Sequence, residues 1–126
     1  MTIDAVAAGD VLSITLPTHD PEGHEQEGVR PAVVVGVPQG YMRYPVVIVV
    51  PLTTQSGLWV ARNPALYQSL PPGAGGIPRA STVLIDQVRA VDIRRVRAYI
   101  GTLEEAAFEP IRTNLLKLFQ NGTLQE

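Results

Sequence analysis

The sequence predicts a small, mostly antiparallel β-barrel that is closed by a C-terminal α-helix. Three observations support this class: β-branched segments are short, proline and glycine separate them, and the apolar spacing changes to a helical period near the C-terminus. Short strands joined by Pro/Gly-rich loops favour a curled sheet over a parallel α/β arrangement. The 126 residues fit one domain, which we expect to span residues 1–126.

The first half of the chain contains three predicted strands. Residues 11–16 alternate loosely and stop at a proline, and a polar loop follows over 18–29. Residues 32–37 are β-branched and lie between two prolines. Residues 46–54 give the strongest strand signal, because a run of Val and Ile predicts a strand buried on both faces at the centre of the domain.

The second half continues the strand pattern with longer interruptions. Residues 58–62 could pair with the central strand after a turn at Ser56-Gly57. Residues 63–79 hold four prolines and three glycines, which predicts a long irregular loop. The remaining strand-like segments are 81–85, 88–91 and part of 96–100.

A helix is predicted to end the chain. Thr102 and Glu105 have the spacing of a capping box, in which Thr closes the helix start and Glu reaches back. Pro110 should kink this helix or mark the first turn of a second one, and Gly122 is a plausible stop. The apolar stripe of one helix face consists of Phe108, Ile111, Leu115, Leu118 and Phe119.

Composition excludes several classes of protein. Cysteine is absent, which rules out a disulfide scaffold and thiolate chemistry, and two histidines leave little to bind a transition metal. We therefore predict no metal and no cofactor. The N-terminus lacks the basic flank and apolar stretch of a signal peptide, and the apolar run at 46–50 is too short to span a bilayer. These features predict a cytoplasmic protein without a membrane partner.

Charge is segregated along the chain although the net charge is only −2. Residues 1–30 carry six acidic side chains against one arginine, and residues 31–100 carry seven arginines against two aspartates. Such segregation could present a basic face to phosphate, and arginine suits forked phosphate contacts. Ordinary solvated surface charge is the alternative explanation.

Three segments together resemble a known family. They are Gly9-Asp10-Val11 with Gly23-His24-Glu25-Gln26-Glu27-Gly28-Val29-Arg30-Pro31, then Val50-Pro51-Leu52-Thr53-Thr54-Gln55, and finally Asp86-Gln87-Val88-Arg89-Ala90-Val91-Asp92. Their order and spacing resemble the MazF/PemK/Kid family of toxin ribonucleases over nearly the whole chain. Each motif alone is weak, and the three in sequence are fairly specific.

The resemblance implies an SH3-like barrel, a homodimer, and a type II toxin–antitoxin system. It implies a sequence-selective mRNA interferase that cleaves single-stranded RNA without metal and so inhibits translation. In that family the ribose 2′-hydroxyl attacks the adjacent phosphate, which leaves a cyclic phosphate and a 5′-hydroxyl. It also implies a cognate antitoxin whose acidic, partly disordered tail occupies the RNA groove.

The matching residues suit this reaction. Arg30 supplies positive charge for the phosphorane oxygens and Thr53 a hydroxyl donor. Glu25 is the candidate general base, provided that burial or the loop raises its pKa towards neutrality. Asp86 and Gln87 match residues that line the same groove. The other residues that we expect to contact RNA are Gln26, Thr54, Arg89 and His24.

Structural explanations compete with each of these roles. Arg30 could form a surface ion pair with Glu25 or Glu27, and Thr53 and Thr54 could simply be β-formers at a strand end.

Asp86 could cap a turn between two strands. His24 stands where many family members have a small residue, and it is either a titrating group or a solvated loop histidine. Leu84 stands where the Kid branch has an arginine, which favours the MazF-type catalytic set.

Two other functions are alternatives to an endoribonuclease. CcdB-like toxins share the expected fold and poison DNA gyrase, chiefly through a C-terminal Trp-Gly-Ile-type tail. This chain ends in residues 121–126 without such a tail, and its single tryptophan is Trp59, which disfavours that reading. The third possibility is a non-catalytic barrel that only binds a partner.

Overall fold

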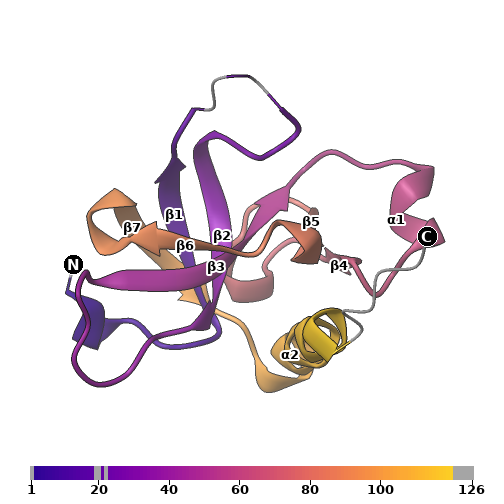
Figure 1. Cartoon of the computed structure of the whole chain (residues 1–126). Helices are drawn as coiled ribbons and strands as arrows, with labels where there is room; N and C mark the ends of the chain where they lie inside the picture. Colours follow the sequence, from indigo (N-terminus) through magenta and orange to yellow (C-terminus); the bar gives the residue numbers. More distant parts are fainter. Residues whose placement is uncertain (1, 19–20, 22, 121–126) are drawn as a thin grey trace.

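The computed structural model describes residues 2–18, 21 and 23–120. Strands dominate these residues, and a long helix follows them (Figure 1). The strands and α-helices are β1 (Asp10–Leu16), β2 (Gly28–Gly36), β3 (Val46–Thr53), α1 (Leu58–Arg62), β4 (Tyr67–Leu70), β5 (Ser81–Leu84), β6 (Arg89–Asp92), β7 (Val96–Thr102) and α2 (Glu105–Gln120). Short 3-10 turns are η1 (Ile3–Ala5), η2 (Ala74–Gly76), η3 (Ile85–Gln87) and η4 (Ile93–Arg95).

The strands form one antiparallel sheet, which confirms the predicted class of a mostly antiparallel β fold with a C-terminal helix. Its order is β4-β5-β3-β2-β1-β7, and β6 pairs with β3 off this path. The sheet is not closed, so the barrel part of the prediction is wrong. The turn η2 packs closely on β7 at one end of the strand order, where a Cβ at Gly76 would lie 2.7 Å from the Ile100 carbonyl oxygen. This packing covers the β7 region without strand pairing.

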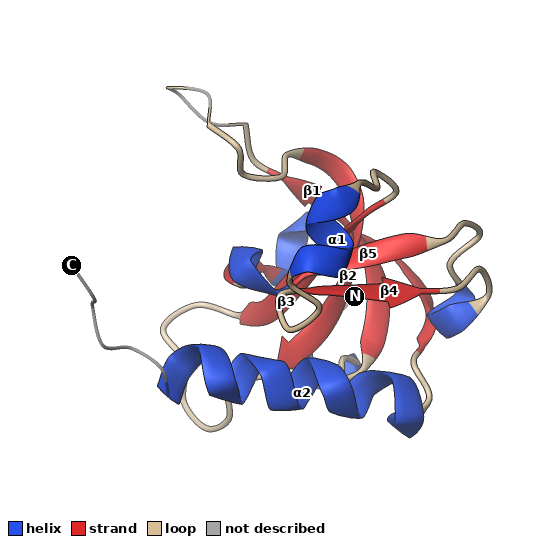
Figure 2. Ribbon diagram, turned by 90° about the vertical axis from the view of Figure 1, so that its right-hand side faces the viewer, coloured by secondary structure: helices blue, strands red, loops and turns tan. Residues whose placement is uncertain are grey.

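The sheet separates two apolar cores, because successive side chains of a strand point to opposite faces. Val50 belongs to the core that contains Phe108, Ile111 and Leu115 of α2, whereas Val49 belongs to the other core. Figure 2 shows α2 lying along one side of the sheet. Val49 and Val50 are both fully buried, so the predicted two-sided burial of the central strand is confirmed.

The predicted strand at 58–62 is wrong, because this segment forms the short helix α1. Both edges of β3 are already occupied: β2 pairs along one edge, and β6 and β5 pair along the other. No edge of the central strand is therefore left for a further partner.

The predicted irregular loop at 63–79 is also partly wrong. β4 (Tyr67–Leu70) lies inside it and pairs with β5, with Tyr67 opposite Leu84 and Leu70 opposite Ser81. The surrounding prolines predict interruption, but the six residues between Pro64 and Pro71 are free to extend, and four of them form β4.

The helix start differs from the predicted capping box. Thr102 is still part of β7, and its hydroxyl donates to Asp10 Oδ1 at 2.9 Å. The helix begins at Glu105, with Ala107 N and Phe108 N both donating to the Glu104 carbonyl at 3.0 Å. Pro110 lies inside one helix that continues to Gln120 and does not begin a second one.

Three details bear on the site. β2 begins at Gly28, before the predicted strand, and so includes Arg30. The predicted stop at Gly122 and the C-terminal tail used against a gyrase-poisoning function lie outside the described residues. In the part of the chain that the structure describes, no helix combines the length and apolar character needed to cross a membrane.

Candidate functional site

Arg30 and Thr53 lie at the same end of the neighbouring strands β2 and β3. β2 and β3 are antiparallel, with Val33 opposite Val50 and Ala32 opposite Pro51. Pairing of the two strands ends at Ala32 and Pro51, and because the strands are antiparallel Arg30 and Thr53 each lie two residues beyond that pair at the same end of the sheet. Two distant motifs of the sequence therefore meet at one end of the sheet.

The two side chains differ in exposure. Arg30 is exposed, and its Nε donates to the Glu27 carbonyl at 3.1 Å, which directs the guanidinium along the end of the β1–β2 loop. Thr53 is 7% exposed, and its Oγ1 accepts a hydrogen bond from Gln55 N at 3.1 Å. The Thr53 hydroxyl thus fixes the turn that leaves β3, as expected of a structural threonine, and it still has its own proton to donate.

The β1–β2 loop is tied to the segment that follows β5. Gln87 Oε1 accepts from Gln26 N at 2.8 Å, and Gln87 Nε2 donates to the His24 carbonyl at 3.3 Å. Arg89 NH1 donates to the Gln26 carbonyl at 3.4 Å. Residues more than sixty positions apart are thereby held together, so the loop is placed by specific bonds.

A pocket of about 250 Å³ opens at this junction and is lined by Glu25, Gln87, Val88 and Arg89. Three of these four are residues that the sequence motifs predict for the site. Glu25 is exposed, so the burial expected for a general base is absent in the single chain. Gln26 Oε1 is buried and has no hydrogen-bond partner among the described residues.

Asp86 does not cap a turn, in contrast to the structural alternative. Its Oδ2 accepts a hydrogen bond from the Tyr67 hydroxyl at 2.7 Å. This bond, partial burial and the nearby carboxylate charge raise the pKa of Tyr67 above its ordinary value of 10.0. Tyr67 in turn contacts Trp59, with ring centroids 4.9 Å apart in an edge-to-face arrangement.

Trp59 and Tyr67 are site neighbours that the sequence reasoning missed. The two aromatic residues lie in segments expected to be a strand and an irregular loop, so nothing placed them beside Asp86. The signal that could have found them is the single tryptophan of the chain shortly after the Thr53-Thr54 motif.

The remaining predicted contacts are less constrained. Thr54 is exposed just beyond β3, and His24 is exposed on the β1–β2 loop. The backbone carbonyl of His24 accepts a hydrogen bond from Gln87 Nε2. The structure therefore brings His24 near the pocket without fixing its imidazole.

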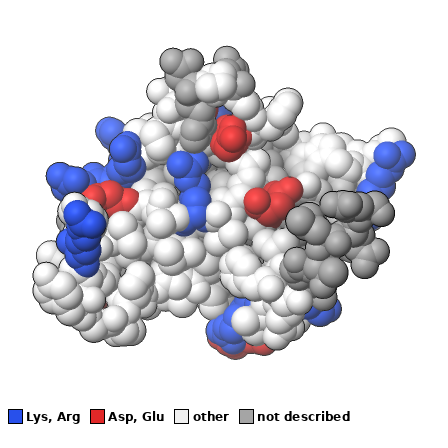
Figure 3. Space-filling model, in the orientation of Figure 1, with Lys and Arg blue, Asp and Glu red and all other residues white. Residues whose placement is uncertain are grey.

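The segregated charges do not form a continuous basic stripe on the face that Figure 3 shows. Basic side chains lie there in separate groups with acidic ones beside them. One such group is at η4, where Arg94 Nε donates to Asp92 Oδ1 at 3.1 Å. Hydrogen bonds from the Arg94 side chain and backbone hold the pKa of Asp92 below its usual range.

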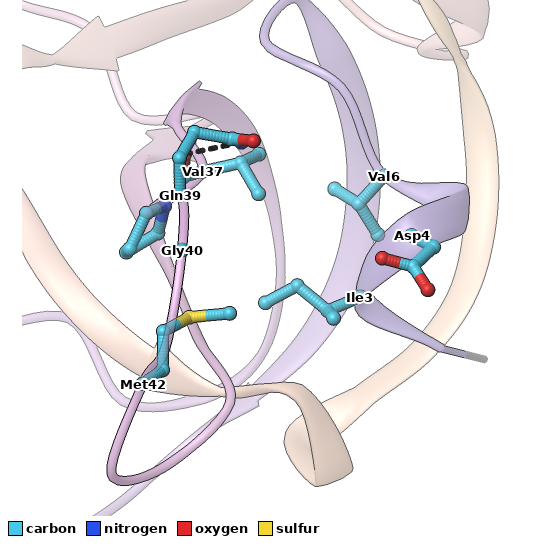
Figure 4. A pocket seen from close by; sticks show the side chains of 8 residues that line it. Ile3, Asp4, Val6, Val37, Gln39, Gly40 and Met42 are labelled. Carbon is cyan, nitrogen blue, oxygen red and sulfur yellow. Dashed lines mark hydrogen bonds between the residues drawn. The ribbon is translucent and has the colours of Figure 1, made fainter.

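A separate hollow of about 210 Å³ lies between the N-terminal turn and the β2–β3 connection (Figure 4). Apolar side chains such as Ile3, Val6 and Met42 line it, and Gln39 Nε2 donates to the Val37 carbonyl at 3.0 Å beside it. It contains none of the predicted site residues. Among the described residues, no group of three or more His, Cys, Asp or Glu side chains is arranged to bind a metal ion.

Comparison with known proteins identifies a family. The family model described as PemK-like, MazF-like toxin of type II toxin-antitoxin system matches residues 7–119. A search of the curated proteins gives no match.

Solved structures with the same fold include MazF from Deinococcus radiodurans, with a TM-score of 0.67 and 22% identity over 91% of this chain and 96% of that one. An endoribonuclease in complex with its cognate antitoxin from Mycobacterial species gives a TM-score of 0.67 and 18% identity, over 95% of this chain and 100% of that one. The Mycobacterium tuberculosis toxin MazF-mt6 gives a TM-score of 0.56 and 18% identity, over 86% and 96%. At these identities the likeness shows a shared fold.

Proposed function

The chain belongs to the PemK-like, MazF-like family of toxins of type II toxin–antitoxin systems, and on that premise we propose that it is an endoribonuclease. Its substrate is single-stranded mRNA in the cytoplasm, which it cleaves at short sequence motifs and so inhibits translation. Two observations carry this proposal: Arg30 and Thr53 lie at the same end of the paired strands β2 and β3, and Glu25, Gln87 and Arg89 line one pocket at the β1–β2 loop that leads into β2.

The reaction is an internal transfer within the RNA. The ribose 2′-oxygen forms a bond to the adjacent phosphorus while the bond from phosphorus to the 5′-oxygen of the next nucleotide breaks. The 2′-hydroxyl proton goes to a base, and the leaving 5′-oxygen gains a proton. The products are a 2′,3′-cyclic phosphate and a 5′-hydroxyl, and no metal is required in this proposal because the nucleophile belongs to the substrate.

The site residues suit the parts of this reaction. The exposed Arg30 guanidinium offers forked donors to the phosphorane oxygens, where negative charge develops. Thr53 places a short hydroxyl at the same end of the neighbouring strand. Glu25 at the pocket rim is the candidate base, and the substrate itself would supply the burial that it lacks in the free chain.

The arrangement also favours particular partners. A pocket of about 250 Å³ on one chain is small for an RNA strand, so we propose that two copies assemble and extend the groove. A family relative is described in complex with its cognate antitoxin. We propose that an antitoxin with an acidic tail neutralises this chain by covering Arg30 and Arg89, which RNA phosphates would otherwise occupy.

The test is an RNA cleavage assay in the presence of EDTA. The purified protein is incubated with a long single-stranded transcript, and the fragment ends are identified. Discrete fragments with 5′-hydroxyl and cyclic-phosphate ends support the proposal. Intact RNA contradicts it, and gyrase-dependent DNA breaks by the same preparation would instead establish a gyrase poison.

A further inference from the structure

Trp59, Tyr67 and Asp86 form a connected cluster, hereafter the aromatic cluster, directly beside the proposed RNA site. The Tyr67 hydroxyl donates to Asp86 Oδ2 at 2.7 Å, and the Trp59 and Tyr67 rings meet edge to face at 4.9 Å. Asp86 precedes Gln87, which lines the pocket and anchors the β1–β2 loop. The cluster therefore adjoins the pocket through the backbone link from Asp86 to Gln87, and its two rings belong to α1 and β4.

The backbone before α1 is shaped to accommodate the indole. A Cβ built at Gly57 would lie 2.8 Å from both Cδ1 and Nε1 of Trp59, so the ring lies against a position without a side chain. With Gly57 on one side and Tyr67 on another, the indole is held in place although it is only half-buried. Part of the ring therefore remains open to a ligand.

Asp86 keeps one free acceptor next to these rings. Tyr67 occupies Oδ2, and no protein group within the described residues occupies Oδ1 of this exposed side chain. A carboxylate repels phosphate, so the part of an RNA strand that can approach it is a base. Exocyclic amino groups of bases donate to carboxylates, as cytosine N4 does to Asp or Glu.

We propose that the aromatic cluster is a nucleobase subsite that favours an amino-bearing base over uracil. Trp59 stacks on the base and Asp86 Oδ1 accepts a hydrogen bond from its exocyclic amino group. Stacking on aromatic side chains and hydrogen bonding to base edges are how single-stranded RNA is recognised. This inference rests on the proposed RNA substrate and adds to it the chemistry of one position in the cleaved motif.

The single tryptophan provides a direct readout. Oligodeoxynucleotides lack the 2′-hydroxyl and cannot be cleaved by the proposed reaction, so they report binding alone. We expect oligo(dC) to quench the emission of Trp59 and to bind about tenfold more tightly than oligo(dU) of the same length. The two bases differ at the group that Asp86 would contact.

Single substitutions test how Asp86 and Tyr67 contribute to the base preference. Asp86→Ala should bring the ratio of the two dissociation constants close to one; the ratio is the proper readout because loss of a negative charge raises affinity for both oligonucleotides. Tyr67→Phe keeps the ring and the carboxylate and should preserve the preference.

Trp59→Leu should weaken binding of fluorescein-labelled oligo(dC), followed by anisotropy, about tenfold or more. Leu58→Ala on the same helix is the matched control, since Leu58 is 76% exposed, and it should change affinity less than twofold. Gly57→Ala displaces the indole without removing it and should reduce the quenching, which tests the subsite even if Trp59→Leu folds poorly.

The outcomes separate this inference from the proposed function. Unchanged Trp59 emission at oligonucleotide concentrations that saturate anisotropy would overturn the subsite, as would equal affinity for oligo(dC) and oligo(dU). RNA cleavage in the EDTA assay would still stand in either case. Quenching with the expected preference but without any RNA cleavage would keep the subsite and reject the nuclease.

Discussion

Arg30 is the residue on which the proposed chemistry depends most, because it lies at the same sheet end as Thr53 and is exposed there. Arg30→Ala should lower the rate of RNA cleavage by about a hundredfold or more, since it removes charge from the transition state. Single-turnover cleavage measures this effect. Stability should hardly change, because surface substitutions of this kind stay within about 0.5 kcal/mol.

Arg79→Ala is the charge-matched control for Arg30. Arg79 is also exposed, and it lies in the loop before β5, outside the pocket residues. Its removal should leave the cleavage rate within about twofold. Equal losses in both variants would mean that Arg30 contributes only general charge.

In the proposed mechanism, the Thr53 hydroxyl donates a hydrogen bond to the reacting phosphate. Thr53→Val keeps the shape but loses the hydroxyl, and it also loses the acceptor for Gln55 N. We expect turnover to fall at least tenfold and stability to fall by about 1 kcal/mol. Thr53→Ser retains the hydroxyl and should keep most of the activity, so a Ser variant as slow as the Val variant would show that Thr53 is only a strand residue.

Tyr67 should titrate above its ordinary range. Its pKa is raised because the phenol donates to Asp86 and because the carboxylate charge disfavours a phenolate. The stability that this bond adds is present below the unfolded-state value of 10.0 and is lost as the pH rises through the folded-state pKa. Ultraviolet absorbance titration should show one late-titrating tyrosine that disappears in Tyr67→Phe.

The variant Asp86→Asn tests the contact between Tyr67 and Asp86 from the side of the carboxylate. Removal of the carboxylate charge should bring the late tyrosine back towards the ordinary range. A titration curve that is the same in wild type and Asp86→Asn would contradict the contact between these two side chains.

Much of the site could be predicted from sequence because its residues lie in short motifs. Glu25, Gln87 and Arg89 were expected in one groove, and the structure places all three around one pocket. Their chemical roles stay predictions. The contact between Trp59 and Tyr67 could not be predicted, because it joins a helix to a strand and the types of these two elements depend on which edges of β3 are already paired.

At the scale of elements, strands with β-branched alternation were predictable and short connecting elements were not. β1, β3 and β5 lie where the pattern places them, since their apolar residues must face the two cores. The Thr102 capping box failed because tertiary contact overrode it: the Thr102 hydroxyl is used by Asp10 across the sheet.

A substitution at Pro110 tests how much this residue costs the stability of α2. It lies inside a continuous helix, where proline lacks the amide that would donate to the carbonyl of the residue four positions earlier. Because Pro110 is exposed, Pro110→Ala should restore this bond without disturbing the core and should stabilise the protein by about 2 kcal/mol. Urea unfolding measures the change, and an unchanged or lower midpoint would mean that the helix gains from the fixed φ of proline.

At the scale of the whole molecule, the fold class follows from composition and spacing, but the open edge of the sheet does not. At β7 the sheet meets the turn η2 instead of a further strand, and Gly76 of this turn adopts a φ of +83° and lies against the Ile100 carbonyl. A backbone contact of this kind leaves no apolar pattern in the sequence. Charge segregation along the sequence also does not predict where the charges lie on the surface. On the face shown in Figure 3, the basic side chains form separate groups.

The central claim is that the RNA is cut by its own 2′-hydroxyl while this chain stabilises the phosphate. The most direct measurement compares an oligoribonucleotide that contains a cleaved motif with the same oligonucleotide carrying one 2′-deoxy sugar at the cleaved nucleotide. We predict that the deoxy substrate binds with similar affinity but is not cut at that position, while the all-ribo substrate yields a cyclic phosphate. Cleavage of the deoxy substrate at the same bond would contradict the account.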